Sequence, residues 1–460
     1  MSKQTTAGKN RARLKSVLAS ALRRIVPSPA EEKRHMSIAN KAIALAFAVV
    51  PNSIGIALTG SSAKGTSLSG STDIDIFLLF PLTYPKHELS FLGLEYAKRA
   101  FRGRKTEIGY ANHPYLRAWL GGYKIDVVPS YRIENASQLS SAVDRSPLHT
   151  KYVNSSLTRA QKNDVRLLKA FAKALGVYGA EARVEGFSGY LCELLVIKYG
   201  SFQGVLEAAS AWNSPVIDIA GHHGHDKARQ MFPQAAMVAI DPVDPNRNVS
   251  AVVSATSLYR LVYASRKFLQ SPGMEYFFPK KQAANPESLG KIIRSRGTEI
   301  VAIEIQSPAL VNDILWPQLK KTTLALRAHL EKHGFAPFGH YFYSDNENCL
   351  MLVECSHGSV PAIRKVTGPA VHMRAACEDF ARKHRGSYDT HIEHDRIVSI
   401  EPSAFTTCWQ ALEDFARSPE KHGVPANFVP LLGSARKVGL ARLLSEKYLF
   451  VAADYFTRKA

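Results

Sequence analysis

Two aspartates separated by one residue mark the part of the chain whose chemistry is clearest. Asp73 and Asp75 stand in Asp73-Ile74-Asp75-Ile76, at the start of an apolar run that predicts a strand. Side chains alternate between the two faces of a strand, so both carboxylates project from the same face and are neighbours in space. Like charges held that close repel each other, and their ordinary use is to coordinate divalent cations such as Mg²⁺.

A loop rich in Gly and Ser precedes these aspartates. It contains Gly60, Ser61 and Lys64 within the string GSSAKGT. Its free backbone N–H groups and hydroxyls form a donor surface suited to phosphate. It is not a Walker loop, because the pattern G-x-x-x-x-G-K-S/T is absent. A phosphate-binding loop beside a metal-binding strand indicates a nucleoside triphosphate as ligand.

A third carboxylate is needed, because two rarely complete a site for two metal ions. Asp126 is the candidate, since it lies in the alternating strand Tyr123-Lys124-Ile125-Asp126-Val127. Each carboxylate alone has a structural alternative: Asp73 could end a turn, and Asp126 could be a solvated strand residue. The three together, in this order after a Gly/Ser loop, favour a metal site.

The surrounding pattern predicts a mixed α/β domain over residues 1–145. Strands are expected over 54–58, 74–80, 105–110, 116–120 and 123–128, helices over 14–25, 31–50 and 87–101, and a loop over 59–72. The basic N-terminal stretch would also suit a transit peptide, but its apolar stripe favours a helix of the domain.

The remainder of the chain predicts two further parts, since 460 residues are too many for one core. Residues 146–278 have mostly helical periodicity, and a Pro/Lys-rich linker follows from Phe278. Residues 279–460 are expected to form a second α/β unit with a basic tail, with strands over 300–305, 337–343 and 349–355 and helices over 316–333 and 374–384.

The charge of the chain favours a polyanionic partner. There are 59 Lys and Arg against 39 Asp and Glu, a net charge of +20, which suits nucleic acid or an anionic membrane. No apolar run reaches the roughly 20 residues of a membrane span, and the run over 42–50 is too short. The five cysteines are widely spaced without a Cys-x-x-Cys pair, which argues against a disulfide framework and suits the cytoplasm.

Further strings make the chain resemble a known family. The carboxylate arrangement is similar to that of the nucleotidyltransferase superfamily that includes DNA polymerase beta. More narrowly, the chain resembles archaeal-type (class I) CCA-adding tRNA nucleotidyltransferases. The strings that carry this resemblance are Ser146-Pro147-Leu148-His149-Thr150, Val165-Arg166-Leu167-Leu168-Lys169, Gly176-Val177-Tyr178-Gly179, Gly186-Phe187-Ser188-Gly189-Tyr190-Leu191-Cys192-Glu193 and Asp241-Pro242-Val243-Asp244-Pro245-Asn246-Arg247.

The resemblance implies an α+β multidomain fold and a reaction. The fold is a nucleotidyltransferase (polymerase beta-like) α/β head over 1–145, a helical neck domain over 146–278, and a C-terminal tRNA-binding α/β body and tail over 279–460. The reaction is addition of C, C and A to the 3′ end of tRNA from CTP and ATP without a template. The implied partner is the tRNA acceptor arm. A membrane is not expected, and a homodimer is compatible with the sequence.

The resemblance also implies roles for individual residues. Asp73, Asp75 and Asp126 would hold two Mg²⁺ ions for in-line displacement of pyrophosphate. Further residues match family positions that contact the nucleotide: Gly60, Ser61 and Lys64 at the triphosphate, His149 and Lys169 at phosphates, Tyr178 at the sugar and Arg247 at the base edge. Many relatives have Glu at Asp73 and Arg-Asn at Lys64-Gly65, which changes the fine geometry of the site and not the type of reaction.

Other functions stay open on the sequence. A poly(A) polymerase or terminal uridylyltransferase would share the three carboxylates, although the strings of the helical domain favour CCA addition. A catalytically dead RNA-binding protein would be expected to lack a carboxylate, and all three are present. His222, His223 and His225 could bind zinc, but no carboxylate or Cys nearby completes a set, so a surface loop is expected. Cys192 is expected to pack in the core.

Overall fold

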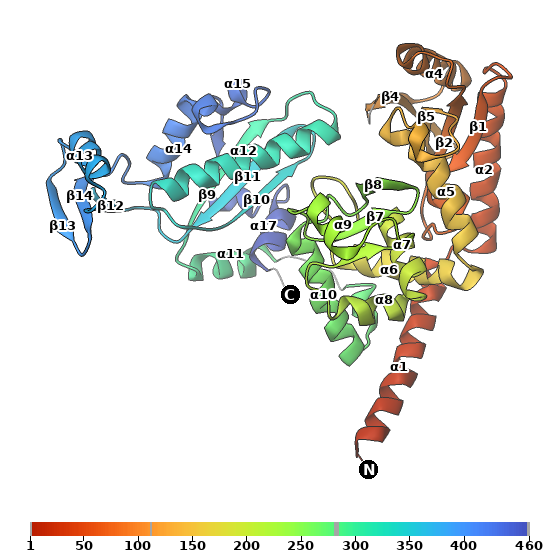
Figure 1. The fold of residues 1–460 in the computed structure, drawn as a ribbon, viewed down its shortest axis with the longest axis horizontal. Coiled ribbons are helices and arrows are strands. Elements are labelled where there is room, and N and C mark those ends of the chain that lie inside the picture. The colour runs from red at the N-terminus through yellow and green to blue at the C-terminus, as the bar shows by residue number, and fades with distance from the viewer. Residues whose placement is uncertain (1, 111–112, 280–284, 458–460) are drawn as a thin grey trace. The chain divides into compact units, whose positions relative to one another are not determined.

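The computed structural model describes residues 2–110, 113–279 and 285–457. The chain divides into two units, Met1–Lys281 and Gln282–Lys459 (Figure 1). The boundary falls in the segment for which the sequence predicts a linker, and residues 280–284 of that segment lie outside the described residues. Within the described ranges, no helix has both the length and the apolar character needed to cross a bilayer.

The first unit begins with two helices and a five-stranded sheet of order β1-β2-β5-β4-β3. Strands β2 and β5 are parallel, and the other neighbouring pairs are antiparallel. The elements are α1 (Ser2–Ile25), α2 (Pro29–Phe47), β1 (Gly55–Thr59), α3 (Gly60–Lys64), β2 (Asp73–Phe80), α4 (Lys86–Ala100), β3 (Thr106–Tyr110), β4 (Pro114–Leu120) and β5 (Tyr123–Tyr131). All five strands expected from the sequence are present, with ends within three residues of the predicted ones.

Alternation along β2 explains how this sheet presents its aspartates. Ile74, Ile76 and Leu78 are fully buried on one face of the strand. Asp73 and Asp75 occupy the intervening positions, where the strand is exposed or half-buried. The apolar face therefore fixes the strand in the sheet and leaves the acidic face available.

The prediction of a loop over 59–72 is wrong for its first part, because Gly60–Lys64 forms the short helix α3. Gly65 ends this helix in the left-handed conformation, with φ of 66°, and its N–H bonds back to the carbonyls of Ser61 and Ser62. Such a C-cap allows one helical turn between two strands even where Gly and Ser have low helix propensity.

A helical layer completes the first unit, and it is accompanied by a small sheet. The helices are α5 (Arg145–Ser156), α6 (Arg159–Ala174), α7 (Gly189–Tyr199), α8 (Phe202–Ala209), α9 (His225–Met231) and α10 (Ala255–Gln270). The strands are β6 (Val216–Asp218), β7 (Val238–Asp241) and β8 (Asp244–Asn248), in the order β6-β7-β8. The sequence indicates the helices but not this sheet, since its strands are three to five residues long and β8 begins with Asp-Pro.

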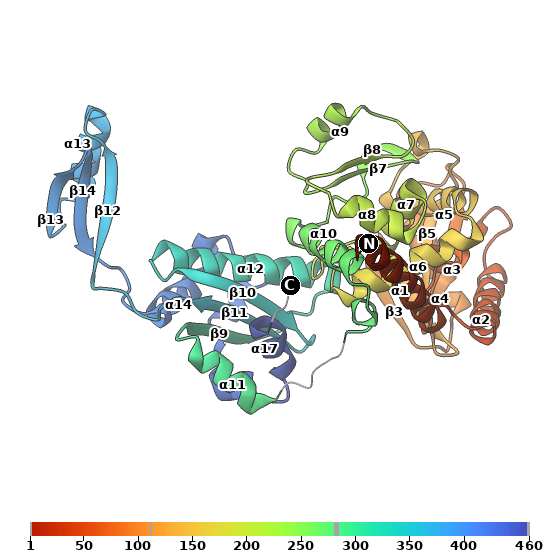
Figure 2. The same ribbon diagram turned by 90° about the horizontal axis from the view of Figure 1, so that it is seen from below.

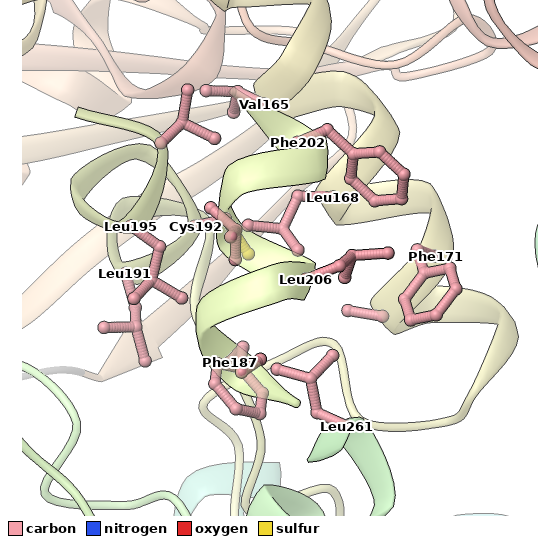
Figure 3. Packing of buried hydrophobic residues seen from close by; sticks show 14 of the residues in the cluster. Val165, Leu168, Phe171, Phe187, Leu191, Cys192, Leu195, Phe202, Leu206 and Leu261 are labelled. Atoms are coloured by element: carbon pink, nitrogen blue, oxygen red, sulfur yellow. The ribbon is translucent and has the colours of Figure 1, made fainter. Parts of the chain in front are cut away.

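The core of the helical layer is aromatic and aliphatic. Phe171, Phe202 and Phe268 meet edge to face, with ring centroids 5.5–5.8 Å apart. Figure 3 shows side chains of α6, α7, α8 and α10 gathered in this core. Helix α6 begins with a capping box, in which Thr158 and Gln161 each accept a hydrogen bond from the other's backbone N–H.

The second unit contains a four-stranded sheet of order β10-β11-β9-β15, with α12 lying along it (Figure 2). A separate three-stranded sheet of order β12-β14-β13 packs with α13 at the far end of this unit. The elements are α11 (Pro286–Ser295), β9 (Glu299–Gln306), α12 (Asn312–Lys332), β10 (Pro337–Ser344), β11 (Asn348–Cys355), β12 (Ile363–Ala370), α13 (Arg374–Lys383), β13 (Asp389–Glu393), β14 (Arg396–Pro402), α14 (Cys408–Arg417), η4 (Pro419–His422), α15 (Val429–Leu432), β15 (Arg436–Lys437), α16 (Leu440–Leu443) and α17 (Leu449–Phe456).

Candidate active site

The three aspartates singled out in the sequence lie on two neighbouring strands. In the parallel register of β2 and β5, Asp75 is paired with Asp126, and Asp73 is paired with Lys124. Because paired residues in a sheet point to the same face, the three carboxylates share one face of the sheet. The structure therefore brings together the residues that the sequence places about fifty positions apart.

The charges of these carboxylates are arranged around Asp75. Burial, followed by the charges of Asp126 and Asp73, raises the pKa of Asp75 to about 6. Each outer carboxylate has a cation: Lys124 Nζ lies 2.7 Å from Asp73 Oδ1, and Arg117 binds Asp126 through two hydrogen bonds of 2.8 and 3.1 Å. The central carboxylate is thus the one that a divalent cation would stabilise most.

The donor set at these carboxylates fits hard divalent cations, which prefer oxygen ligands. Among the described residues, however, the oxygens of Asp73, Asp75 and Asp126 do not form a group of three ligand atoms that all lie within 4.8 Å of one another. Arg117 and Lys124 hold the two outer carboxylates, Asp126 and Asp73, in ion pairs. Sequence reasoning did not name Arg117, although its place on β4 opposite Asp126 follows from strand alternation.

Gly60 places the backbone of α3 directly against the central carboxylate. Its φ is 69°, and a Cβ at this position would lie 2.0 Å from Asp75 Oδ2. Only glycine permits both the left-handed conformation and this close approach. Ser62 supports the same turn, since its hydroxyl donates to the Asp73 carbonyl at 3.1 Å and lies 2.8 Å from His35 Nε2. Ser61, the next residue after Gly60, is half-buried on α3.

Lys64 and Lys169 meet at a buried glutamate. Lys64 Nζ donates to Glu193 Oε2 at 2.8 Å, and Lys169 Nζ donates to Glu193 Oε1 at 3.1 Å. Lys169 also donates to the carbonyl and the hydroxyl of Thr66, at 3.3 and 3.0 Å. The exposed fractions of Lys64, Lys169 and Glu193 are 6%, 2% and 1%. Three charges are therefore withdrawn from water together.

The charge state of Glu193 follows from these contacts. Burial alone would raise the pKa of its carboxyl, but Lys169 and Lys64 outweigh burial and hold the pKa below its usual range. Sequence reasoning gave Glu193 no role. The available signal was a single acidic residue within the apolar helix string Leu191-Cys192-Glu193-Leu194-Leu195, which is a position where a buried charge needs a partner.

Tyr178 lies beside this cluster. It forms a parallel bridge with Phe187, and burial raises the pKa of its hydroxyl, with further contributions from Cys192, Glu193 and Asp73. A Cβ on Gly189 would lie 3.2 Å from the Tyr178 hydroxyl and 3.5 Å from Lys169 Cε. Tyr178 is therefore within electrostatic reach of both the lysine cluster and the carboxylates.

A second buried carboxylate collects two of the predicted residues. Asp241 is fully buried; its Oδ2 lies 2.8 Å from His149 Nε2 and accepts from Arg247 Nη1 at 2.7 Å, while its Oδ1 accepts from the Tyr190 hydroxyl at 3.0 Å. The His149 ring stacks on Tyr190 with centroids 3.9 Å apart. Lys64 Nζ lies 5.0 Å from the centroid of the Tyr190 ring. The cluster around Asp241 and the cluster around Glu193 are therefore adjacent.

The pKa values of His149 and Asp241 are both lowered, for different reasons. Burial lowers the pKa of His149, which favours a neutral imidazole. Burial would raise the pKa of Asp241, but the hydrogen bonds from His149 and Arg247 lower it to about 2. Asp241 thus remains a carboxylate that fixes the positions of His149, Tyr190 and Arg247.

Arg247 also lines a cavity of about 430 Å³. Other lining residues are Arg145, Ala180, Ser188 and Asn246. Its volume falls within the range of small-molecule sites. The Arg247 side chain is 36% exposed, so it faces this space while one guanidinium nitrogen bonds Asp241.

The remaining candidates from the sequence are structural. His222 Nε2 and His223 Nε2 lie 3.0 and 2.9 Å from the carbonyls of Pro242 and Pro245, and they belong to the loop that precedes α9. Cys192 is fully buried, and burial raises the pKa of its thiol to about 12. The prediction of a loop is therefore confirmed for His222 and His223 and wrong for His225, which begins α9, and the prediction of core packing is confirmed for Cys192.

The glycine turn at Gly60 lies against acidic residues carried by two parallel strands, and this arrangement is that of a nucleotidyltransferase. Residues 46–149 match the model of the nucleotidyltransferase domain, residues 163–278 the second domain of tRNA nucleotidyltransferase, and residues 296–425 the C-terminal domain of the CCA-adding enzyme. The CCA-adding enzyme of Methanothermobacter thermautotrophicus is 40% identical over 368 residues, which cover 79% of each chain. The chain belongs to the CCA-adding enzyme family, and it is an enzyme of the tRNA nucleotidyltransferase class.

Two further similarities were found. The CCA-adding enzyme of Archaeoglobus fulgidus is 38% identical over 359 residues, covering 78% of this chain and 80% of that one. A solved structure of a cytoplasmic RNA terminal U-transferase is 15% identical, with a TM-score of 0.45, and the alignment covers 58% of this chain and 97% of that one.

Proposed function

We propose that this chain adds C, C and A to the 3′ end of tRNA from CTP and ATP, without a template and with release of pyrophosphate. Membership of the CCA-adding enzyme family and the single acidic face formed by Asp73, Asp75 and Asp126 support this function. The observation that carries the proposal is the register pairing of Asp75 with Asp126, since it puts carboxylates on adjacent strands where one metal site can use both.

The three carboxylates are proposed to hold Mg²⁺, a cation with the oxygen preference that this donor set offers. Bound metal ions supply activation of the attacking hydroxyl and neutralisation of charge on the leaving phosphates. Lys124 and Arg117 keep the outer carboxylates oriented toward the same face. Gly60 holds the backbone of α3 against Asp75, so the donors of this turn lie beside the reacting groups.

The triphosphate is proposed to contact Gly60, Ser61 and Lys64. The hydrogen bond from Lys64 to Glu193 uses one of the three donors of its ammonium group, so Lys64 can keep Glu193 and bind a phosphate as well. Lys169 differs, because its contacts to Glu193 and to two oxygens of Thr66 use three donors. Phosphate binding by Lys169 therefore requires one of these bonds to be exchanged, and otherwise Lys169 positions Glu193.

The base and sugar are proposed to lie toward the cavity lined by Arg247. The guanidinium group carries five N–H donors, and those not used by Asp241 can pair with acceptors on cytosine or adenine. Tyr178 is proposed to contact the sugar. His149, fixed by Asp241 and stacked on Tyr190, is proposed to face the phosphates, where it can donate from Nδ1 when the ring is protonated, because its Nε2–H already donates to Asp241. These roles use residues from α5, the 178–188 segment and β8.

We also propose a three-part organisation: a catalytic head over residues 1–145, a nucleotide-recognition domain over 146–278, and a body and tail over 279–460 that bind the tRNA acceptor arm. The excess of 20 positive charges supports a nucleic-acid partner. A cytoplasmic location and a homodimer stay predictions of the sequence.

Incubation with tRNA that lacks its 3′ end tests the proposal directly. Each labelled nucleoside triphosphate is supplied alone and in combination, and products are resolved at single-nucleotide length. Ordered incorporation of two C followed by one A is expected. Long homopolymer tails from ATP or UTP would instead assign the chain to poly(A) or poly(U) synthesis.

A further inference from the structure

A histidine in the second unit has a buried nitrogen without a hydrogen bond. His329 lies on α12 and is 5% exposed, and its Nε2 atom is buried with no hydrogen-bond partner. The nearest charged atom described for it is Asp414 Oδ2 on α14, at 3.6 Å, which is beyond hydrogen-bond length. A buried imidazole nitrogen left in this state is destabilising unless another ligand completes its contacts.

A second histidine shares this condition. His422, the last residue of η4, also has a buried Nε2 atom with no hydrogen-bond partner. The rings of His329 and His422 lie 4.3 Å apart. One ligand atom each from His329, Asp414 and His422 fall within 4.8 Å of one another, and in the described parts of the chain no other group of three metal-binding side chains does so.

The alternative is that the imidazoles only pack against aromatic rings. The Phe415 ring centroid lies 5.8 Å from that of His329 and 5.1 Å from that of His422, and the Phe405 centroid lies 4.7 Å from that of His333. Such contacts explain how the carbon atoms of the imidazole rings are packed. They provide no partner for the two buried Nε2 atoms, and they do not explain why a carboxylate completes the group.

We propose that His329, Asp414 and His422 bind a zinc ion that ties α12 to the α14–η4 segment. Two imidazoles and one carboxylate are ligands that Zn²⁺ commonly takes, with bonds of about 2.0–2.2 Å. Tetrahedral geometry with such bonds separates ligand atoms by about 3.3–3.6 Å. The 3.6 Å separation of His329 and Asp414 already meets this value, and the rest of the group closes with side-chain shifts of about 1 Å.

The site is structural by its position. Helices α12 and α14 pack together, and η4 contacts both, so the three ligands come from three adjoining elements of one unit. Three protein ligands leave a fourth position for water or for His333, whose ring lies 4.8 Å from that of His329. The apolar shell of Phe405 and Phe415 would exclude bulk water from the metal.

Metal binding by the full-length protein tests the proposal. The protein is treated with a chelator, returned to buffer containing excess Mg²⁺, and titrated with Zn²⁺ against a chromophoric chelator. Co²⁺ is used in parallel as a spectroscopic probe of nitrogen ligands. One Zn²⁺ site is expected, with a rise in Tm of about 5 °C or more at saturating Zn²⁺. Absence of any zinc site overturns the proposal.

Substitutions locate the metal. Asp414→Asn keeps the shape of the side chain, and His422→Gln removes a partly exposed ring, so both variants should fold. Each is expected to weaken Zn²⁺ binding at least about a hundredfold and to remove the Co²⁺ spectrum. The matched control is His391→Gln, because His391 pairs with Asp389 at 3.0 Å on the surface without a third ligand.

A variant of the catalytic carboxylates separates the two metal sites. Asp75→Asn is expected to retain the Zn²⁺ affinity and the Co²⁺ spectrum of the native protein. Loss of zinc binding in Asp75→Asn would assign the zinc to the carboxylates of the sheet, and its persistence in both Asp414→Asn and His422→Gln would show that His329, Asp414 and His422 do not hold it; either result overturns the proposal.

Discussion

The ammonium group of Lys64 on α3 donates to Glu193 on α7 at 2.8 Å, so a buried ion pair joins the turn beside Asp75 to the helical layer. Lys169 on α6 binds the other oxygen of the same carboxylate. Glu193 therefore balances two buried cations at once. This arrangement links α3 to the helices α6 and α7.

Substitution Glu193→Gln should destabilise the first unit by about 3–5 kcal/mol, because it leaves two buried lysines without their counter-charge. The measurement is the free energy of unfolding in urea. The matched control is Glu95→Gln, which removes the carboxylate of an exposed pair with Lys98 and should have little effect. Equal stability of the Glu193→Gln variant and the native protein would show that the lysines do not depend on this carboxylate.

Substitution Asp75→Asn should reduce nucleotide incorporation by more than about a thousandfold, since it removes the carboxylate proposed as the central metal ligand. Binding of tRNA, measured by filter retention, should change little. Asp226→Asn is the control, because the Asp226 side chain is 95% exposed and pairs with its neighbour His225. Unchanged turnover in Asp75→Asn would refute the metal assignment.

Local patterning predicted the sheet that carries the aspartates because the first residues of β2, Asp73 to Ile76, and of β5, Tyr123 to Val127, alternate between apolar or aromatic and charged side chains. That period fixes which side chains share a face, and it places Asp75 beside Asp126 once the strands pair. Helix α3 was missed because its sequence of Gly and Ser favours a loop. This helix is stabilised by contacts from outside its own sequence, since Asn154 on α5 donates to the Ala63 carbonyl at 3.2 Å, and Gly65 caps its C-terminus.

The partners of the buried charged residues could not be predicted from the sequence. Glu193 lies 129 residues from Lys64, and Asp241 lies 92 residues from His149. No local period encodes such pairings, which depend on how the helical layer packs against the sheet. The sequence identified His149, Lys64 and Lys169 through a family resemblance, but it could not show that each is bound to a buried carboxylate.

The carboxylate of Asp241 predicts a specific acid dependence. Its pKa is lowered to about 2 in the folded protein, so the carboxylate stabilises the fold at any pH above its unfolded pKa of 3.8. This stabilisation is lost as pH falls through the folded pKa. It amounts to about 2 kcal/mol at pH 6, and about half of it is gone at pH 3.

Chemical denaturation at pH 6 and pH 3 checks this dependence by comparing the native protein with Asp241→Asn. The difference in unfolding free energy between the two proteins should narrow at pH 3, because Asn does not titrate. A difference that stays constant between these pH values would mean that Asp241 acts only through neutral hydrogen bonds.

Gly60, at the start of α3, and Gly70, in the segment between α3 and β2, offer a matched pair of substitutions. Both have positive φ, of 69° and 77°, so alanine at either position should destabilise by about 1–2 kcal/mol through backbone strain. Their surroundings differ: a Cβ on Gly60 would lie 2.0 Å from Asp75 Oδ2, whereas nothing lies within 4 Å of a Cβ on Gly70.

Only Gly60→Ala should therefore displace the central carboxylate. A displacement of about 1 Å reduces the rate by about a hundredfold, so Gly60→Ala should lose this much incorporation while Gly70→Ala keeps most of it. Single-turnover incorporation with saturating tRNA measures the difference, and thermal unfolding of both variants shows that strain is matched. Equal loss of activity in the two variants would attribute the effect to strain in the turn, and equal retention would show that Asp75 does not need the close approach of Gly60.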